Sequence, residues 1–164
     1  DIGIGTGYYL DHCEFQSASP KIMLADLNSN CLSKVSHRIK RYSPKTILMN
    51  VFDERTYPDQ KFDSIGINYL LHCLPGPFES KLKIIAKLAP LLHPGGVFFG
   101  STIMGQSAPH NLFGRFLLKA YSKNGIFSNA DDNADDLQNA LIKVFGNGQV
   151  IVEGRVARFF AQKS

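Results

Sequence analysis

Apolar residues in the first 103 positions follow two alternating patterns. Short, nearly continuous apolar runs occupy residues 21–26, 45–50, 62–70 and 97–103, as is typical of buried strands. Between several of these runs, apolar residues recur every three or four positions, which is the spacing of one helix face. Strands and helices that alternate in this way predict a parallel sheet covered by helices on both faces.

Local signals mark the ends of two predicted helices. Asn28 or Ser29 can cap the first helix, which ends before Pro44. Pro-Gly-Pro at residues 75–77 starts the second helix, and "HPGG" at residues 93–96 stops it. The apolar face of the second helix is predicted to comprise Phe78, Leu82, Ile85, Leu88 or Ala89, and Leu92.

The last third of the chain departs from this alternation. Residues 104–130 mix Gly, Ser, Asn and Pro with one apolar segment at 112–121, which we interpret as an excursion that contains a helix and covers a site. A further helix is predicted at about 134–145. Two short strand runs joined at Gly154 and Arg155 then predict a hairpin, so the final strand is expected to be antiparallel.

Length and composition fit a single globular domain over residues 1–164. Hydrophobic residues make up 44% of the chain and charged residues 20%, and no apolar run approaches the roughly 20 residues that span a bilayer. The three cysteines are widely spaced and lack a CxxC pairing. We therefore expect reduced thiols in a cytoplasmic protein, with no disulfide framework, no metal site and no membrane association.

Charged residues gather in one basic and one acidic cluster. The basic cluster lacks the aromatic residues of an RNA-binding surface, so we interpret it as a solvated helix face and expect no nucleic-acid partner. The acidic cluster, in "NADDNADD", could bind a metal ion, but the apolar helical series that follows it favours helix capping. The basic cluster comprises Lys34, Arg38, Lys40, Arg41 and Lys45, and the acidic one Asp131, Asp132, Asp135 and Asp136.

The opening stretch "DIGIGTG" carries the first candidate chemistry. Gly3, Gly5 and Gly7 follow Asp1 at every second position, and such a backbone can adopt positive φ and let a ligand approach closely. Their spacing differs from the G-x-G-x-x-G of the nicotinamide and flavin fingerprint. Asp26 ends the next predicted strand, where an acid can accept both hydroxyls of a ribose. Together they predict a nucleoside cofactor without separating NAD from other adenosine cofactors.

Two later motifs narrow this choice. Phe62-Asp63 opens a strand, and "LLHPGG" at 91–96 precedes the next. With the glycine loop and Asp26, they closely resemble the class I S-adenosylmethionine-dependent methyltransferases over residues 1–162, although His93 replaces the usual basic residue of L-[KR]-P-G-G. The resemblance implies an α/β fold of the three-layer αβα Rossmann-like type, with a mostly parallel sheet and an antiparallel C-terminal strand.

The resemblance also implies which residues hold the adenosine end of S-adenosylmethionine. Asp26 would bind the ribose hydroxyls, and Leu27 would pack on the adenine. The family has an acid for the adenine amino group after the third strand; here spacing places Asn50 in that slot, next to Val51, and Asp53 is the alternative. An Asn side-chain oxygen can also accept from an amino group.

The methionine end and the reaction follow from the same resemblance. In-line displacement would move the activated methyl group to an acceptor and leave S-adenosylhomocysteine, with positioning supplying most of the acceleration. His72 is the candidate general base, although its apolar neighbours in "LLHCL" also suit a structural histidine. The methionine portion would be held by Asp1, by the backbone of Gly3, Gly5 and Gly7, and by Asn68 and Tyr69 beside the sulfonium.

The acceptor is expected to be a small organic molecule. Residues 68–71 read Asn-Tyr-Leu-Leu in place of the [ND]-P-P-[YF] run of enzymes that methylate amide or adenine nitrogens, and no acid cluster suits metal-assisted catechol methylation. His110 and Tyr121 could contact such a substrate, and Ser101 is expected to pack in its strand. Two alternatives are a catalytically silent cofactor-binding partner module and an NAD-dependent oxidoreductase.

The start of the chain raises a further expectation. Only Asp1 and Ile2 precede the glycine loop, and there is no initiator Met. We expect that the beginning of the first strand and an N-terminal cap over the substrate are missing, and that residues 1–164 alone turn over slowly.

Overall fold

The computed structural model describes residues 1–105 and 132–164, which form two compact units. The first unit is Asp1–Asp59 and the second is Gln60–Ser164. Most of the predicted excursion, with its helix at 112–121, His110 and Tyr121, falls outside the described residues. Within the part that is described, no helix is long and apolar enough to cross a membrane.

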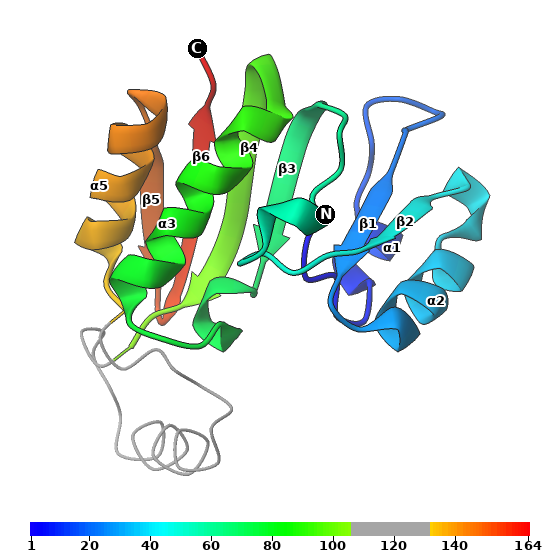
Figure 1. Ribbon diagram of the computed structural model, residues 1–164, viewed down its shortest axis with the longest axis horizontal. Helices are drawn as coiled ribbons and strands as arrows, with labels where there is room; N and C mark the ends of the chain where they lie inside the picture. Colours follow the sequence, from blue (N-terminus) through cyan, green and yellow to red (C-terminus); the bar gives the residue numbers. More distant parts are fainter. Residues whose placement is uncertain (106–131) are drawn as a thin grey trace, which may run out of the picture. The chain divides into compact units, whose positions relative to one another are not determined.

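The first unit is built on two parallel strands. β1 and β2 pair in register from Met23 opposite Lys45 to Asp26 opposite Leu48, and Ile2 forms one parallel bridge with Ala25 (Figure 1). The elements of this unit are α1 (Tyr8–His12), β1 (Met23–Asp26), α2 (Ser29–Arg38), the 3-10 turn η1 (Lys40–Tyr42), β2 (Lys45–Leu48) and the 3-10 turn η2 (Glu54–Thr56).

Helix α2 forms where its cap and its apolar spacing predict it. The Asn28 side chain accepts a hydrogen bond from the N–H of Asn30 at 2.9 Å, which satisfies one of the unpaired donors of the first turn. Leu32, Val35 and Ile39 recur at helical spacing and pack with Ile4, Leu10 and Leu24 in the core of this unit. The core therefore joins α2 to both β1 and the glycine loop.

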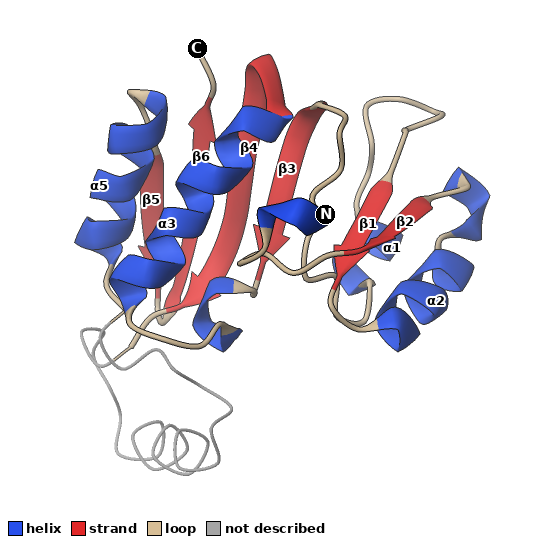
Figure 2. Cartoon of the chain, viewed as in Figure 1, coloured by secondary structure: helices blue, strands red, loops and turns tan. Residues whose placement is uncertain are grey.

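The second unit contains a four-stranded sheet in the order β3-β4-β6-β5. β3 and β4 are parallel, whereas β6 is antiparallel to both β4 and β5, and α3 and α5 cover one face (Figures 1 and 2). The elements are β3 (Phe62–Asn68), the 3-10 turn η3 (Leu71–Cys73), α3 (Phe78–Leu88), the 3-10 turn η4 (Ala89–Leu91), β4 (Leu92–Ile103), α5 (Ala134–Phe145), β5 (Gln149–Glu153) and β6 (Val156–Gln162). The predicted C-terminal hairpin and its antiparallel strand are confirmed.

The "HPGG" stretch differs from its prediction, because it lies inside β4 and does not end a helix. α3 already ends at Leu88, and β4 begins at Leu92, which pairs with Phe62. The register then shifts before Ser64 pairs with Val97. The extra residues of β4 are held by the residue that follows β6, since the Gly95 N–H donates to the Lys163 carbonyl at 2.8 Å. Pairing with a neighbouring strand thus overrides the local turn signal.

The two helices of this unit bury a charged pair that the periodicity did not predict. Along α3 the buried positions are Phe78, Lys81, Ile84, Ile85 and Leu88, so Lys81 lies in the core and Leu82 beside it is only partly buried. Before α5, Asn133 is the N-cap and exchanges two hydrogen bonds with Asp136, at 2.8 and 2.7 Å. The helix is therefore capped by Asn133, whose side chain Asp136 holds in place, and Asp132 is buried against Lys81.

Candidate active site

The glycine loop adopts the left-handed backbone that its sequence predicts. Gly3, Gly5 and Gly7 have φ of 70°, 52° and 72°, a region that residues with a Cβ rarely occupy. A Cβ at Gly5 would meet nothing within 4 Å, so the space over this glycine is open to a ligand. A Cβ at Gly7 would lie 2.5 Å from a Val35 methyl carbon, so only glycine lets the loop pack on α2.

Backbone bonds fix this loop to β1. The Gly3 N–H donates to the Ala25 carbonyl at 2.8 Å, and the Ala25 N–H donates to the Asp1 carbonyl at 2.9 Å. These bonds extend the parallel pairing to the first residues of the chain and hold the loop beside the end of β1.

Two arginines of the predicted basic cluster hold the loop and the short helix after it. Arg38 Nη1 donates to the Thr6 carbonyl at 2.7 Å. Arg41 pairs with the Asp11 carboxylate at 2.6 Å and also donates to the Asp11 carbonyl at 2.7 Å. Both arginines are solvent-exposed, as expected, but they anchor the loop as well. Sequence reasoning missed these contacts because they join residues 30 or more positions apart.

Asp26 and Leu27 stand together at the end of β1. Asp26 Oδ1 accepts a hydrogen bond from the Asn28 N–H at 2.8 Å, which fixes the orientation of the carboxylate. Leu27 is 69% exposed, an unusual exposure for a leucine that directly follows a buried strand. A carboxylate acceptor and an apolar surface are therefore adjacent at this strand end.

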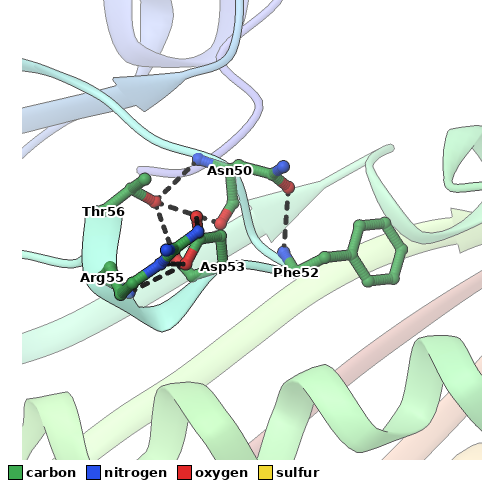
Figure 3. Close-up of polar contacts among 5 residues, drawn as sticks. All are labelled: Asn50, Phe52, Asp53, Arg55 and Thr56. Carbon is green, nitrogen blue, oxygen red and sulfur yellow. Dashed lines mark hydrogen bonds and ion pairs between the residues drawn. The ribbon is translucent and has the colours of Figure 1, made fainter.

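Asn50 lies at the same end of the two-stranded sheet as Asp26. The Met49 N–H donates to the Asp26 carbonyl at 3.0 Å, which places the residues after β2 beside Asp26. Asn50 Oδ1 accepts from the Phe52 N–H at 3.0 Å, and the Asn50 N–H donates to the Thr56 hydroxyl at 2.9 Å (Figure 3). Val51 is buried, and its carbonyl accepts a 2.6 Å hydrogen bond from the Tyr57 hydroxyl.

Asp53 has a different set of contacts. Arg55 binds both of its carboxylate oxygens at 2.8 Å, and the Arg55 N–H donates to Oδ1 at 3.2 Å (Figure 3). This fork-shaped pair orients the Asp53 carboxylate toward Arg55 and starts η2. Arg55 thus supplies three donors to Asp53, whereas among the described residues Asn50 Oδ1 accepts one hydrogen bond, from the Phe52 N–H.

Asn68, Tyr69 and His72 come together in the second unit, after β3. The Ser101 hydroxyl donates to Asn68 Oδ1 at 3.2 Å, and the Tyr69 N–H donates to the Ser101 carbonyl at 2.7 Å. Tyr69 has φ of 56°, which is rare for a residue with a large side chain, and such strain is found at functional sites. The Tyr69 and His72 rings meet edge to face, with their centroids 6.0 Å apart.

His72 is a buried and neutral imidazole. Burial, with a smaller contribution from the positive charge of Lys81, lowers the pKa of His72 to about 4. Its Nδ1 accepts from the Ile103 N–H at 3.4 Å and lies 3.5 Å from the Thr102 hydroxyl. A nitrogen that accepts from a backbone N–H carries no proton, so the ring proton of neutral His72 is on Nε2.

The chain matches known proteins over most of its length. Residues 1–98 match the methyltransferase domain family. Demethylluteothin O-methyltransferase of Streptomyces thioluteus is 39% identical over 95% of this chain and 68% of its own length. Methyltransferase aurB of Calcarisporium arbuscula is 36% identical over 99% of this chain and 76% of its own.

Solved structures share the fold at low sequence identity. An O-methyltransferase family protein from Burkholderia thailandensis superposes with a TM-score of 0.76 at 17% identity, and PigF, solved with S-adenosylhomocysteine, with 0.73 at 17%. All of this chain is covered in the first and 99% in the second, whereas the chain spans only 50% and 49% of those two proteins.

These matches show that the chain belongs to the class I S-adenosylmethionine-dependent methyltransferases. The predicted family, fold class and cofactor are therefore confirmed. These matches do not support the alternative of an NAD-dependent oxidoreductase. Methyl transfer from S-adenosylmethionine is the reaction of this family.

Proposed function

We propose that residues 1–164 act as one methyltransferase domain that transfers a methyl group from S-adenosylmethionine to a hydroxyl oxygen of a small organic molecule. The observation that carries the cofactor site is the joint position of Asp26 and Asn50 at one end of the β1–β2 pair, beside a glycine loop with open space above it. The oxygen acceptor is supported by relatives that are named O-methyltransferases.

The residues of the first unit fit the adenosine half of the cofactor. Asp26, whose Oδ1 is oriented by the Asn28 N–H, would accept the ribose hydroxyls, and Leu27 would pack on the adenine. Asn50 Oδ1 would accept a hydrogen bond from the adenine amino group in preference to Asp53, because three donors of Arg55 hold the Asp53 carboxylate and its charge is paired with that guanidinium. Val51, which follows Asn50, would contribute its backbone to the same subsite.

The methionine half would be held by Asp1, by the backbone at Gly3, Gly5 and Gly7, and by Asn68 and Tyr69. When bound, S-adenosylmethionine supplies a methyl group activated by its sulfonium, so the protein needs no nucleophile of its own. The chain must then orient the acceptor in line with that methyl group and exclude water. Ser101 would keep Asn68 and Tyr69 in place through its two bonds to them.

His72, the predicted general base, would orient the acceptor, because its Nδ1 already accepts the Ile103 N–H and a neutral imidazole has no second lone pair for the acceptor's proton. The low pKa of His72 keeps the ring neutral at pH 7, and its Nε2–H would donate a hydrogen bond to the acceptor oxygen. His72 would therefore serve an acceptor hydroxyl that ionises easily and releases its proton to water, and its effect on the rate would come from orientation.

A cytoplasmic location is also proposed. Cys13, Cys31 and Cys73 are thiols, and none of them forms a disulfide with another described residue. Reduced thiols suit a reducing compartment.

The proposed cofactor site is tested by calorimetric titration with S-adenosylmethionine, S-adenosylhomocysteine and NAD. We expect both adenosyl ligands to bind, NAD to give no heat, and Asp26→Asn to weaken binding at least tenfold. Asp59→Asn is the matched control, because Asp59 is exposed and belongs to the same unit. Equal affinity of Asp26→Asn and the parent protein would contradict the site.

Catalysis is tested separately with S-adenosylmethionine labelled in its methyl group. The purified protein is offered a panel of small phenols, enols and aliphatic alcohols, and label is followed into each acceptor. Transfer to any hydroxyl supports the proposed reaction. Binding of the cofactor without transfer to any member of the panel would instead favour a catalytically silent cofactor-binding module.

A further inference from the structure

An ion pair between Lys81 and Asp132 is enclosed in the interior of the second unit. Lys81 Nζ lies 3.2 Å from Asp132 Oδ1 and 3.3 Å from Oδ2, and the two side chains are 0% and 1% exposed. Lys81 comes from the first turns of α3, and Asp132 directly precedes the N-cap of α5. The pair therefore joins the beginnings of two helices that are far apart in the sequence (Figure 1).

A buried ion pair of this kind contributes little net stability to a fold. Removing two charges from water costs several kcal/mol for each ion, and their attraction often does no more than offset that cost. Apolar side chains of similar volume are frequently as good or better at such positions. The apolar face of α3 offers a place for one, since Phe78 and Ile85 lie on the same stripe as Lys81. A role other than packing is therefore indicated.

Asp132 also holds the end of β4. Its carbonyl accepts from the Gly105 N–H at 3.1 Å, and the Met104 N–H next to it donates to the Arg155 carbonyl at 2.8 Å. One residue further back, the Ile103 N–H donates to His72 Nδ1 at 3.4 Å. A continuous path of bonds therefore runs from Lys81 through Asp132 and the end of β4 to the imidazole of His72.

We propose that Lys81 and Asp132 form a positioning pair, which fixes the end of β4 so that its Ile103 N–H holds His72 in one orientation and one neutral tautomer. The proposal rests on the proposed role of His72 in methyl transfer. Lys81 would act through Asp132 and the backbone of β4, and also through its positive charge, which disfavours a second proton on the ring.

The charged and titratable groups around His72 are consistent with this role. Lys81 faces it from α3, Asp132 neutralises Lys81 from the start of α5, and Tyr69 presents its ring edge from the segment after β3. Thr102, which is fully buried, lies 3.5 Å from the same Nδ1. Of these groups, Lys81 carries the charge that lowers the pKa of His72.

The test compares single variants with a paired apolar replacement. Lys81→Met and Asp132→Leu each remove one charge of the buried pair and keep the opposite one, so we expect each to lower the melting temperature strongly. The double variant K81M/D132L removes both charges and should recover most of that loss. The rate is measured with labelled S-adenosylmethionine and the acceptor of highest turnover from the panel above.

In the double variant, the melting temperature should recover but the rate of methyl transfer should not. We expect its kcat to stay at least tenfold below that of the parent protein, with KM for S-adenosylmethionine unchanged and the acid limb of the kcat profile moved to higher pH. A double variant that regains both melting temperature and kcat would overturn the proposal, because the pair would then be structural only.

A measurement on the parent protein keeps the proposal testable even if these variants fail to fold. Nitrogen-15 NMR of the imidazoles should find His72 as the Nε2–H tautomer and unprotonated at pH 5.5. A protonated His72 at that pH, or an Nδ1–H tautomer, would overturn the proposal. This readout needs no acceptor, so it is independent of whether the proposed methyl transfer occurs.

Discussion

Arg38, in the last turn of α2, donates a 2.7 Å hydrogen bond to the carbonyl of Thr6 in the glycine loop. The bond ties the loop to the helix that packs beneath it, in addition to the contact of Gly7 with Val35. A loop whose peptide groups are fixed before the ligand arrives loses less entropy on binding.

Replacement of Arg38 should therefore weaken cofactor binding without removing any ligand contact. We expect Arg38→Met to raise the Kd for S-adenosylhomocysteine about fivefold, the loss that corresponds to one hydrogen bond. Lys34→Met is the matched control, because Lys34 is exposed on the same helix. Calorimetric titration measures both, and an equal Kd for the two variants would show that the bond does not prepare the loop.

Gly5 and Gly7 should respond differently to alanine, although both have positive φ. At Gly5 the added Cβ meets open space, so the cost to stability is backbone strain of about 1 kcal/mol. At Gly7 the Cβ also collides with Val35, which should add roughly 1–3 kcal/mol. Urea unfolding without cofactor measures the difference, and G7A/V35A should recover part of it. Cofactor affinity should show the opposite order. Gly5→Ala should raise the Kd for S-adenosylhomocysteine more than Gly7→Ala does, although it costs less stability.

A deaminated ligand tests whether Asn50 or Asp53 accepts the hydrogen bond from the adenine amino group. S-inosylhomocysteine carries an oxygen where adenine has its amino group, so it cannot donate to Asn50 Oδ1. The parent protein should prefer S-adenosylhomocysteine about tenfold, the value of one hydrogen bond together with an unfavourable oxygen contact. Asn50→Ala should abolish this preference, and Asp53→Asn should keep it. The opposite pattern would assign the adenine contact to Asp53.

Acid should destabilise the protein through His72. Its pKa of about 4 in the folded state is below the ordinary 6.5, so the unfolded chain binds this proton first as the pH falls. The resulting stabilisation is complete above pH 6.5 and is lost between pH 6.5 and 4, by about 3 kcal/mol in all.

His72→Asn removes this pH-dependent stabilisation, since the Asn Oδ1 can accept a hydrogen bond from the Ile103 N–H but does not titrate. The free energy of unfolding of this variant should fall less steeply over the same pH range than that of the parent protein. Parallel curves for the two proteins would show that His72 keeps an ordinary pKa. His37→Asn is the control, because His37 is exposed and the substitution is the same.

Much of the fold could be predicted because the signals were local. Asn28 caps α2, the apolar runs mark β1 to β3, and the short spacing at Gly154 and Arg155 gives the hairpin of β5 and β6. "HPGG" was misinterpreted because its turn chemistry is local, whereas the pairing of Leu92 with Phe62 that draws it into β4 is not.

The candidate site was predictable to the same extent. Asp26 and Asn50 could be located because Asp26 ends a strand and Asn50 comes shortly after the next, and the ends of parallel strands meet at one edge of a sheet. The capture of Asp53 by Arg55 could not be predicted, since spacing alone does not tell a paired carboxylate from an available one. Lys81 has one signal in the sequence: with Phe78 and Ile85 it falls on the apolar stripe of α3, where a lysine is out of place.

The burial of Lys81 against Asp132 should affect how these two positions vary among homologous proteins. A change at either position alone leaves a charge stranded in the interior, whereas a change at both can be harmless to folding. The two positions are 51 residues apart, yet the effect of a substitution at one depends on the residue at the other. Lineages that descend from the same ancestor should retain the lysine and the aspartate together or have lost both, and a lineage with only one of them should be rare.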